Sequence, residues 1–533
     1  MDSNSPNTNG APVLNGSSSR KVNRVVVLGG GSAGFLVALA IKKHLPDTPL
    51  VVVRSTKMGV IGVGEGTIWS VVNFLHRFLG LDPARFHRDV RPTLKLGIHY
   101  LWGSRPFFNY TFAPQLSQPL EKTNILRGYF CDEECDYADI ASALMTFDKA
   151  CLRLPNGQPQ ILPNHAYHLE NRRFVGFLES ISDEWGIEKI DDLVNGVEQD
   201  ESGIKALLLE SGNRVEGDLF IDASGFRSEL IGKALDVEFV DFSNELYCDS
   251  AIFGGWERNE EDVIHPYTTA ETMDAGWSWR IEHDEVVNRG YVFCSKYISD
   301  EDADAEFRRK NPHVEMTKCI KFRPGVRRKT WHKNVIAVGN SAGFVEPLEA
   351  TAIGMICDSA VNIVRALAAN EGHIHPVQAE AYSRIQFENW EIIRDFLALH
   401  YKFNDRLDTP FWNAAQEETP LGRTEKIVDY YRVTGPDMSL IGADLKRDFF
   451  DLEGYLSMLV GQKVPYERKI EFSLQERNQW KVYKNRLRDS MYSAMDMREC
   501  LTHLRGENAF ANPNKEGATI DINSPHVGEL QWH

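Results

Sequence analysis

The chain has 533 residues, of which 42% are hydrophobic and 25% are charged, and its formal net charge is −17. This composition is typical of globular proteins and excludes a mainly disordered chain, a collagen and a coiled-coil rod. The acidic balance argues against a nucleic-acid partner, because neutralising phosphates needs a surplus of lysine and arginine. It also argues against binding to an anionic membrane surface.

Eight cysteines scattered over the chain are too few for a disulfide framework, and no group of residues has the ligand spacing of a zinc site. We therefore expect reduced thiols and no metal. No apolar signal segment is visible near residue 1. The most apolar stretch, residues 25–41, is interrupted by glycines and is too short to span a membrane. These features predict a cytoplasmic protein without membrane contact.

The hydrophobic pattern divides the chain into four parts. Residues 1–20 are rich in Asn, Ser, Gly and Pro and are predicted to be a disordered tail. Residues 21–376 contain the strand patterns of an α/β nucleotide-binding body with an interleaved second sheet, and residues 377–506 have helical spacings that predict a C-terminal cap. Residues 507–533 form a polar tail. The clearest predicted strands are residues 25–28, 50–53, 94–100, 219–222 and 335–338.

The first predicted strand leads into a glycine-rich turn and an apolar helix. Gly29, Gly31 and Gly34 fit the pattern G-x-G-x-x-G, and Ser32 and Ala33 complete the turn. The first glycine permits the tight turn, the second lets a pyrophosphate approach the backbone, and the third lets the helix pack on the strand. Free N–H groups at the start of the helix favour the same anion. The sequence therefore predicts a dinucleotide site here.

The second predicted strand departs from the usual dinucleotide pattern. It should end in an acidic residue that binds the adenosine ribose, but it ends in Arg54. An arginine here is compatible with a ribose 2′-phosphate, with a pyrophosphate contact or with stacking on adenine. The sequence leaves these alternatives open.

Two later segments indicate which dinucleotide binds. Residues 217–225 form a strand that runs into a small-residue turn at Asp222, and residues 334–343 form a strand with a second glycine turn at Gly339 and Asn340. With the first glycine loop, they resemble the FAD-binding fold of the flavin monooxygenase superfamily. Its late motif G-D-A-A-H-x-x-x-P is G-N-S-A-G here, so Asn340 replaces the usual aspartate. The resemblance implies a Rossmann-like α/β fold and FAD as the cofactor.

Four further segments narrow the resemblance. Residues 62–67 read G-V-G-E-G-T, residues 276–281 read G-W-S-W-R-I, residues 346–351 read E-P-L-E-A-T, and residues 406–412 read R-L-D-T-P-F-W. In this order they resemble the flavin-dependent tryptophan halogenases, from about residue 24 to about residue 420. One departure is clear: Glu282 stands where the family signature W-x-W-x-I-P has proline.

The resemblance implies a reaction and residues that carry it. Reduced FAD and oxygen would convert chloride or bromide into hypohalous acid, which halogenates an electron-rich aromatic ring of indole or tryptophan type. Lys95 would receive the hypohalous acid and Glu349 would act as the base. Backbone N–H groups of Thr351 and Ala352 would hold the halide. A separate NADH-dependent flavin reductase is the implied partner, and a homodimer is left open.

The resemblance also assigns residues around the flavin. Trp277 and Trp279 would separate the flavin from the substrate. The implied FAD-binding residues are Gly29, Gly31, Ser32, Ala33, Gly34, Arg54, Gly64, Glu65, Val194, Asp222, Gly339, Asn340, Phe344, Leu348 and Ile353.

Each of these residues also has a simpler explanation when it is taken alone. Lys95 would be solvated on the outer face of an alternating strand, Glu349 would complement a helix dipole, and the two tryptophans would be core. Two functional alternatives stay open: an FAD-dependent aromatic hydroxylase or reductase of the same fold, and a halogenase that acts only on a carrier-tethered substrate. The aromatic residues within 428–464 would line an indole-sized pocket or form helix core.

Overall fold

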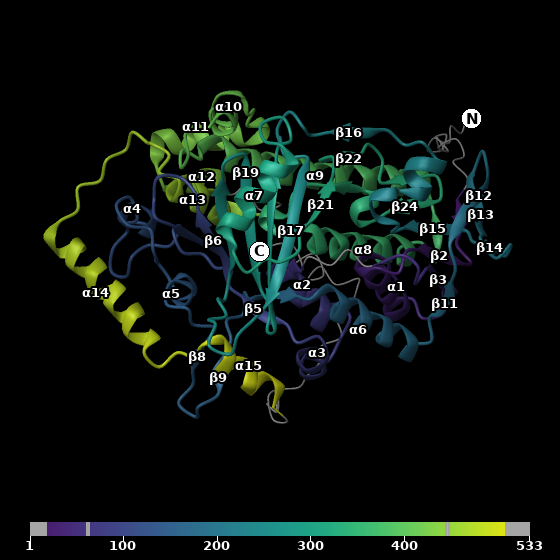
Figure 1. Cartoon of the computed structure of the whole chain (residues 1–533), viewed down its shortest axis with the longest axis horizontal. Coiled ribbons are helices and arrows are strands. Elements are labelled where there is room, and N and C mark those ends of the chain that lie inside the picture. Colours follow the sequence, from purple (N-terminus) through teal and green to yellow (C-terminus); the bar gives the residue numbers. More distant parts are fainter. Residues whose placement is uncertain (1–18, 60–63, 443–444, 446–447, 507–533) are drawn as a thin grey trace, which may run out of the picture.

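The computed structural model describes residues 19–59, 64–442, 445 and 448–506 (Figure 1). Our predictions for residues 1–18 and 507–533 therefore lie outside the described residues, as do residues 62–63 of one family motif. Arg20 belongs to strand β1 (Arg20–Lys21), which pairs with β26 (His373–Ile374). None of the helices in the described part of the chain has the length and apolar character needed to cross a membrane.

A six-stranded sheet forms the predicted nucleotide-binding body. Its order is β11 (Glu188–Asp191), β3 (Leu50–Arg54), β2 (Val25–Leu28), β15 (Leu219–Asp222), β24 (Val335–Ala337) and β23 (Trp331–His332), and only β23 is antiparallel. Four predicted strands are confirmed to within one residue. Their apolar runs are buried on both faces, as parallel sheets require. Helices α1 (Ser32–His44), α6 (Asn171–Glu184) and α8 (Ala352–Ala368) pack together beside this sheet.

The second sheet has seven strands and is largely antiparallel. Its order is β21 (Lys318–Lys321), β17 (Ser250–Glu257), β20 (Val286–Phe293), β19 (Gly276–Glu282), β18 (Thr268–Met273), β6 (Gly97–Leu101) and β7 (Phe108–Thr111). Because its strands alternate along the chain with those of the first sheet, the prediction of an interleaved second sheet is confirmed.

The strand predicted over residues 94–100 is two strands that belong to different sheets. β5 (Thr93–Lys95) pairs with β10 (Ala166–Leu169), which also pairs with β4 (Glu65–Gly66), whereas β6 joins the seven-stranded sheet. The chain changes sheets at Leu96, whose N–H donates to the carbonyl of Pro266. Both faces of the segment are covered, and Lys95 is 0% exposed. A solvated role for Lys95 is therefore excluded.

The C-terminal third is helical, as predicted. Its helices are α9 (Pro376–Phe403), α10 (Pro410–Glu418), α11 (Glu425–Thr434), α12 (Ser439–Gly442), α13 (Asp451–Gly461), α14 (Leu474–Met491) and α15 (Met497–Arg505). Helices α10 to α13 lie on the side of the molecule away from β2 and β3, and α13 packs on β7 (Figure 1). Apolar side chains of α9, α10 and α13 share one core with the seven-stranded sheet.

Smaller elements complete the fold. The short helices are α2 (Trp69–Asn73), α3 (Pro83–Asp89), α4 (Arg127–Phe130), α5 (Ile140–Thr146) and α7 (Asp300–Lys310). The remaining strands are β8 (Leu152–Arg153), β9 (Pro159–Gln160), β12 (Val194–Asp200), β13 (Gly203–Leu209), β14 (Arg214–Glu216), β16 (Phe239–Asp241), β22 (Gly325–Arg327) and β25 (Gly343–Phe344).

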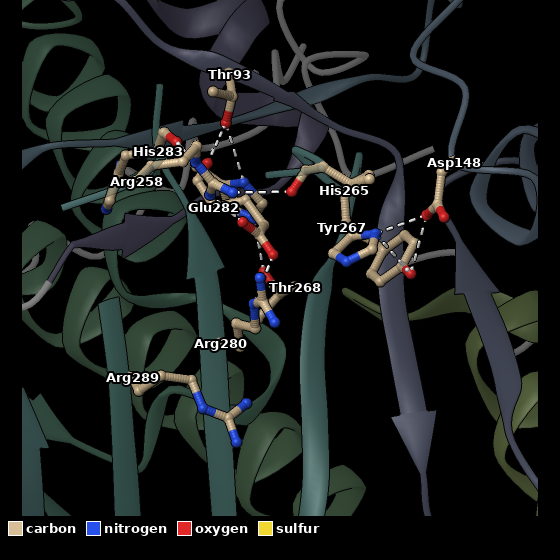
Figure 2. Close-up of polar contacts among 12 residues, drawn as sticks. Thr93, Asp148, Arg258, His265, Tyr267, Thr268, Arg280, Glu282, His283 and Arg289 are labelled. Atoms are coloured by element: carbon tan, nitrogen blue, oxygen red, sulfur yellow. Dashed lines mark hydrogen bonds and ion pairs between the residues drawn. The ribbon is translucent and has the colours of Figure 1, made fainter. Parts of the chain in front are cut away.

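Glu282, which replaces the proline of the family signature, anchors a buried polar network (Figure 2). Its carboxylate pairs with Arg258, and the side chain of each is only 1% exposed. The Nε of Arg280 lies 2.7 Å from its other oxygen. The Thr93 hydroxyl, two residues before Lys95, donates to the Glu282 carbonyl. The network thus ties the end of β19 to the strand that carries Lys95.

We expect Glu282→Gln to lower the free energy of unfolding by about 3 kcal/mol, because it leaves the guanidinium of Arg258 buried without its charged partner. Urea unfolding followed by fluorescence measures this loss. The matched control is Glu257→Gln, an exposed glutamate of the same sheet, which should change stability by less than about 0.5 kcal/mol. Equal stabilities of the two variants would contradict a supporting role for the ion pair.

Candidate active site

A cleft of about 910 Å³ lies at the carboxyl edge of the six-stranded sheet. A pocket of this size is in the range of cofactor sites. The predicted FAD-binding residues that line it are Gly29, Gly31, Ser32, Ala33, Arg54, Glu65, Val194, Gly339, Asn340 and Ile353. The structure thus brings together most of a set that is spread over more than half of the sequence.

The glycine loop has the shape that a bound dinucleotide needs. A Cβ at Gly29 would lie 2.2 Å from the carbonyl oxygen of Ala223, and a Cβ at Gly34 would lie 1.9 Å from that of Gly29. These two glycines therefore serve the tight turn and the contact of helix with strand. A Cβ at Gly31 would meet no described atom within 4 Å, so the cleft is open there. Helix α1 begins at Ser32 without a side-chain cap, which leaves its first N–H groups for an anion. The cleft fits FAD.

Five predicted flavin residues do not line the cleft in the described part of the chain. Gly34 serves helix packing, Gly64 has a left-handed backbone conformation with φ +72°, and Leu348 is core. Phe344 packs edge-on against Phe226, which does line the cleft.

Asp222, the fifth of these residues, organises the turn after β15. Its Oδ1 accepts from the N–H and hydroxyl of Ser224, and its Oδ2 accepts from the N–H groups of Leu230 and Ile231 at 2.8 and 2.9 Å. The carboxylate is therefore satisfied within the protein. Asp222 contributes to the shape of the cleft indirectly, because it holds Ser224, which lines the cleft.

Arg54, at the end of β3, pairs with an acidic residue from another element. The Nη2 of Arg54 lies 2.5 Å from Oε1 of Glu179, a residue of α6 that lines the same cleft. Lys189 lies 3.2 Å from that oxygen. A Cβ at Gly30 would lie 2.6 Å from the Cβ of Arg54, so the arginine stem rests on the glycine loop. Sequence reasoning missed Glu179 because no local pattern links α6 to the end of β3.

A second, separate cavity of about 40 Å³ lies beyond the cleft. The two share a wall, residues 349–353. Glu349 and Thr351 line the small cavity, whereas Ala352 and Ile353 line the cleft. Between them Ala350 adopts the left-handed conformation, with φ +55° and ψ +33°, which costs a non-glycine residue about 1 kcal/mol. Strain of this kind is typical of functional sites.

Lys95 lies against this wall. Its Nζ donates to the carbonyl of Thr67 at 3.1 Å and lies 5.5 Å from the centre of the Phe112 ring, which lines the small cavity. A Cβ at Gly66 would lie 3.3 Å from both Lys95 Nζ and the Cβ of Ala350. Burial lowers the pKa of Lys95 to about 7, and the nearby charge of Glu349 opposes this shift. The ammonium therefore lies beside the turn that carries Glu349, behind Phe112.

The carboxylate of Glu349 is held by two residues that the sequence did not indicate. Its Oε1 accepts from the hydroxyl of Tyr100, on β6, and lies 2.8 Å from Nε2 of His400, on α9. Glu349 is only 3% exposed and His400 is fully buried. These contacts join positions 249 and 51 residues apart, and no spacing rule connects them.

Trp277 and Trp279 are buried side by side on β19, with ring centres 6.1 Å apart. Neither lines the cleft or the small cavity, as far as the described residues define them. Trp277 Nε1 donates to Oε2 of Glu346 at 2.8 Å, and the hydroxyl of Tyr401 donates to the same oxygen at 2.7 Å. Burial raises the pKa of Glu346 to about 7. Trp277 thus holds the segment that leads to Glu349.

The aromatic residues predicted over 428–464 divide between pocket and core. Phe449 and Phe450 line the small cavity, whereas Tyr431 and Tyr455 are core. Glu453 also lines the cavity, but its carboxylate accepts from the N–H groups of residues 116 and 117 at 2.6 and 3.2 Å. The core interpretation therefore holds for Tyr431 and Tyr455, whereas the indole-sized pocket stays a prediction, because the cavity that Phe449 and Phe450 line has a volume of only about 40 Å³.

Comparisons with known proteins agree with this arrangement. The fold and cleft are those of a flavin-dependent enzyme. The chain belongs to the tryptophan halogenase family, whose sequence model matches residues 24–475. Tryptophan 7-halogenase RebH of Lentzea aerocolonigenes is 27% identical, with 83% of this chain and 90% of the relative covered. Tryptophan 6-halogenase ThaL of Streptomyces albogriseolus is 30% identical, with 78% and 83% covered.

Solved structures give the same result. MibH, described as a lanthipeptide tryptophan 5-halogenase, is 34% identical with a TM-score of 0.82, and 92% of this chain and 94% of that chain are covered. A flavin-dependent halogenase from Brevundimonas sp. BAL3 is 28% identical with a TM-score of 0.79, and 91% and 100% are covered. The predictions of the fold class and of a flavin-dependent halogenase are confirmed, and use of FAD and halide follows for the family.

We expect Gly31→Ala to weaken FAD binding about tenfold, equivalent to about 1.4 kcal/mol, because the added methyl group would occupy open space in the cleft. The melting temperature of the FAD-free protein should not change, since Gly31 has a negative φ that alanine adopts. Fluorescence titration with FAD measures the affinity.

The matched control is Gly34→Ala, in which the methyl group would collide with the backbone of Gly29. This variant should lower the melting temperature of the FAD-free protein. An unchanged FAD affinity in Gly31→Ala would show that the dinucleotide does not bind at this loop.

Proposed function

We propose that this enzyme halogenates the indole ring of tryptophan or of a tryptophan-like compound, using reduced FAD, oxygen and chloride or bromide. The observation that carries the proposal is the shared wall between cleft and cavity. One side of residues 349–353 lines the cleft and the other lines the cavity, and Lys95 lies against the same turn. An oxidant formed in the cleft would therefore have to pass only this segment to reach the Glu349 carboxylate in the cavity.

The cleft would hold FAD with its pyrophosphate at Gly31 and the start of α1. When bound, reduced FAD supplies with oxygen the oxidising power that turns halide into hypohalous acid. Reduced FAD comes from a separate NADH-dependent reductase in this proposal. Chemically reduced FAD should therefore replace the reductase in the reaction mixture.

The halide would bind where the wall segment enters α8. Backbone N–H groups of Thr351 and Ala352 stand at the start of this helix, whose dipole favours an anion. Ala352 lines the cleft and Thr351 lines the cavity. An anion there would lie on the segment between the cleft and the small cavity, beside the turn that Lys95 approaches.

Lys95 would meet the hypohalous acid at the wall. A pKa of about 7 leaves both protonation forms populated at neutral pH. The ammonium donates a hydrogen bond to hypohalous acid. The neutral amine reacts with it to form a haloamine and water, in which one N–H bond and one O–halogen bond break. Either form holds the electrophilic halogen at a fixed point, and that position decides which ring carbon is attacked.

Glu349 would remove the proton that the halogen replaces. Attack by the ring on the halogen leaves a cationic ring with one C–H bond to break. The Glu349 carboxylate takes this proton, and the electron pair of the bond restores aromaticity. Its charge also stabilises the cation before the proton leaves.

The substrate cavity must widen to admit a ring. Its volume of about 40 Å³ is well below the roughly 150 Å³ of an engineered cavity that binds benzene. Residues 449–453 form one side of it, so their side chains have to move when a substrate enters. Because one solved relative is described as acting on a lanthipeptide, a peptide-borne tryptophan belongs in the test beside free tryptophan.

The proposal is tested by incubating the enzyme with a flavin reductase, NADH, FAD and halide, and with a panel of free tryptophan, a tryptophan-containing peptide, indole and a phenol. We expect an indole-bearing product whose mass and isotope pattern change between chloride and bromide. The matched control omits halide. A hydroxylated product without halogen, formed equally in both halides, would favour the hydroxylase alternative and overturn the proposal.

We expect Lys95→Met to abolish halogenation while FAD affinity is unchanged, because Lys95 lies against the wall and outside the cleft lining. The melting temperature should not fall, since methionine removes a buried charge from a site of similar volume. Product analysis by mass spectrometry measures the loss. The control is Lys205→Met, an exposed lysine of β13, which should keep full activity. Normal turnover by Lys95→Met would remove Lys95 from the mechanism.

A further inference from the structure

Glu349 faces a histidine, His400, that has no role in the reaction proposed above. His400 Nε2 lies 2.8 Å from Oε1 of Glu349, and the hydroxyl of Tyr100 donates to the same oxygen and lies 3.2 Å from that nitrogen. All three side chains are buried. Oε2 accepts no hydrogen bond from any residue that the structure describes, and Glu349 lines the small cavity.

The hydrogen bonds of His400 fix where its protons are. Its Nδ1 lies 2.7 Å from the carbonyl of Phe396, which can only accept, so Nδ1 carries a hydrogen. A hydrogen bond between Nε2 of His400 and Oε1 of Glu349 requires a second proton, which lies between these two atoms. Tyr100 also donates to Oε1, and two donors on one oxygen favour a carboxylate. This geometry fits a ring that donates through Nδ1 to Phe396 and through Nε2 to the carboxylate of Glu349.

We propose that His400 and Tyr100 are positioning residues that keep Glu349 ionised and leave its Oε2 free to take the proton of the substrate ring. This inference rests on the proposed role of Glu349 as the base.

A base at this depth needs such support. Burial raises the pKa of two other enclosed carboxyl groups, Glu346 and Glu453, to about 7. A carboxyl group that has already bound a proton cannot accept one from the ring. A buried charge persists when it is paired and hydrogen-bonded, and His400 and Tyr100 provide both.

The surrounding charges fit an ion pair at this place. Lys95 lies near enough for the charge of Glu349 to raise its pKa against the effect of burial. On the other side, the field of His400 lowers the pKa of Glu346 against burial. Burial and the charge of Glu349 hold the pKa values of Tyr100 and Tyr110 well above the usual range, so Tyr100 keeps its hydrogen.

The proton balance closes without a change at His400. The ring C–H bond breaks, its electron pair returns to the ring, and the proton moves to Oε2 of Glu349. The group that gives up the halogen takes this proton: the hydroxide from hypohalous acid becomes water, or the Lys95 nitrogen from the haloamine becomes the amine again. The imidazolium keeps both protons and stabilises the carboxylate before and after the step.

The first test compares the pH profiles of kcat for the wild type, His400→Gln and Glu349→Gln. Without the imidazolium, the carboxyl group holds its proton to higher pH. We expect the acid limb of the His400→Gln profile to move up by about one pH unit, so that kcat falls by up to about tenfold along that limb and recovers at higher pH, with an unchanged KM. Tyr100→Phe should move the limb in the same direction by less. The control His313→Gln, on the surface, should leave the profile unchanged.

Nitrogen-15 NMR of the FAD-free protein with labelled histidine gives a readout that is independent of turnover. The signals of His400 are identified by their loss in His400→Gln. We expect an imidazolium at neutral pH in the wild type and a neutral ring in Glu349→Gln. A neutral His400 in the wild type, or an unshifted profile for His400→Gln, would overturn this inference alone.

The Glu349→Gln variant tests the proposed function separately in the same experiment. We expect Glu349→Gln to lower kcat about 10²-fold at every pH, the scale of one acid–base group. Full turnover by that variant would remove Glu349 as the base, whatever the state of His400.

Discussion

The left-handed turn at Ala350 is the constraint on which the site depends. It ends the short helix that carries Glu349 and directs the next residues into α8, so neighbouring residues line two different cavities. Gly66 makes room for the turn, since a side chain there would press on Ala350 and on Lys95. The sequence Glu346 to Thr351 thus places a carboxylate toward one cavity and the start of a helix toward the other.

The site also contains several buried ionisable groups, and each of them has a hydrogen-bond partner in the protein. Lys95 donates to Thr67, Glu349 accepts from Tyr100 and faces His400, and Glu346 accepts from Trp277 and Tyr401. Such groups weaken the core by themselves, because desolvation opposes their ionisation. Their concentration around one turn is therefore more consistent with chemistry than with stability.

The strands and the glycine loop that depend on local sequence patterns could be predicted from the sequence. Strands β2 and β15 were identified to the residue, because buried parallel strands read as continuous apolar runs. The glycine loop was identified because its geometry allows few other residues. The prediction of a single strand over residues 94–100 was wrong, because the alternation of side chains does not reveal that the chain changes sheets at Leu96. Glu179 and His400 were missed because each meets its partner only through the tertiary fold.

The most direct measurement of the central claim is bromide anomalous diffraction from crystals grown with FAD. We predict the flavin ring in the cleft beside Ile353 and a bromide peak at the backbone N–H groups of Thr351 and Ala352. We also predict that the ring and Glu349 lie on opposite sides of residues 349–353. A flavin ring in contact with the Glu349 carboxylate, or bromide bound only away from this turn, would contradict the two-cavity account.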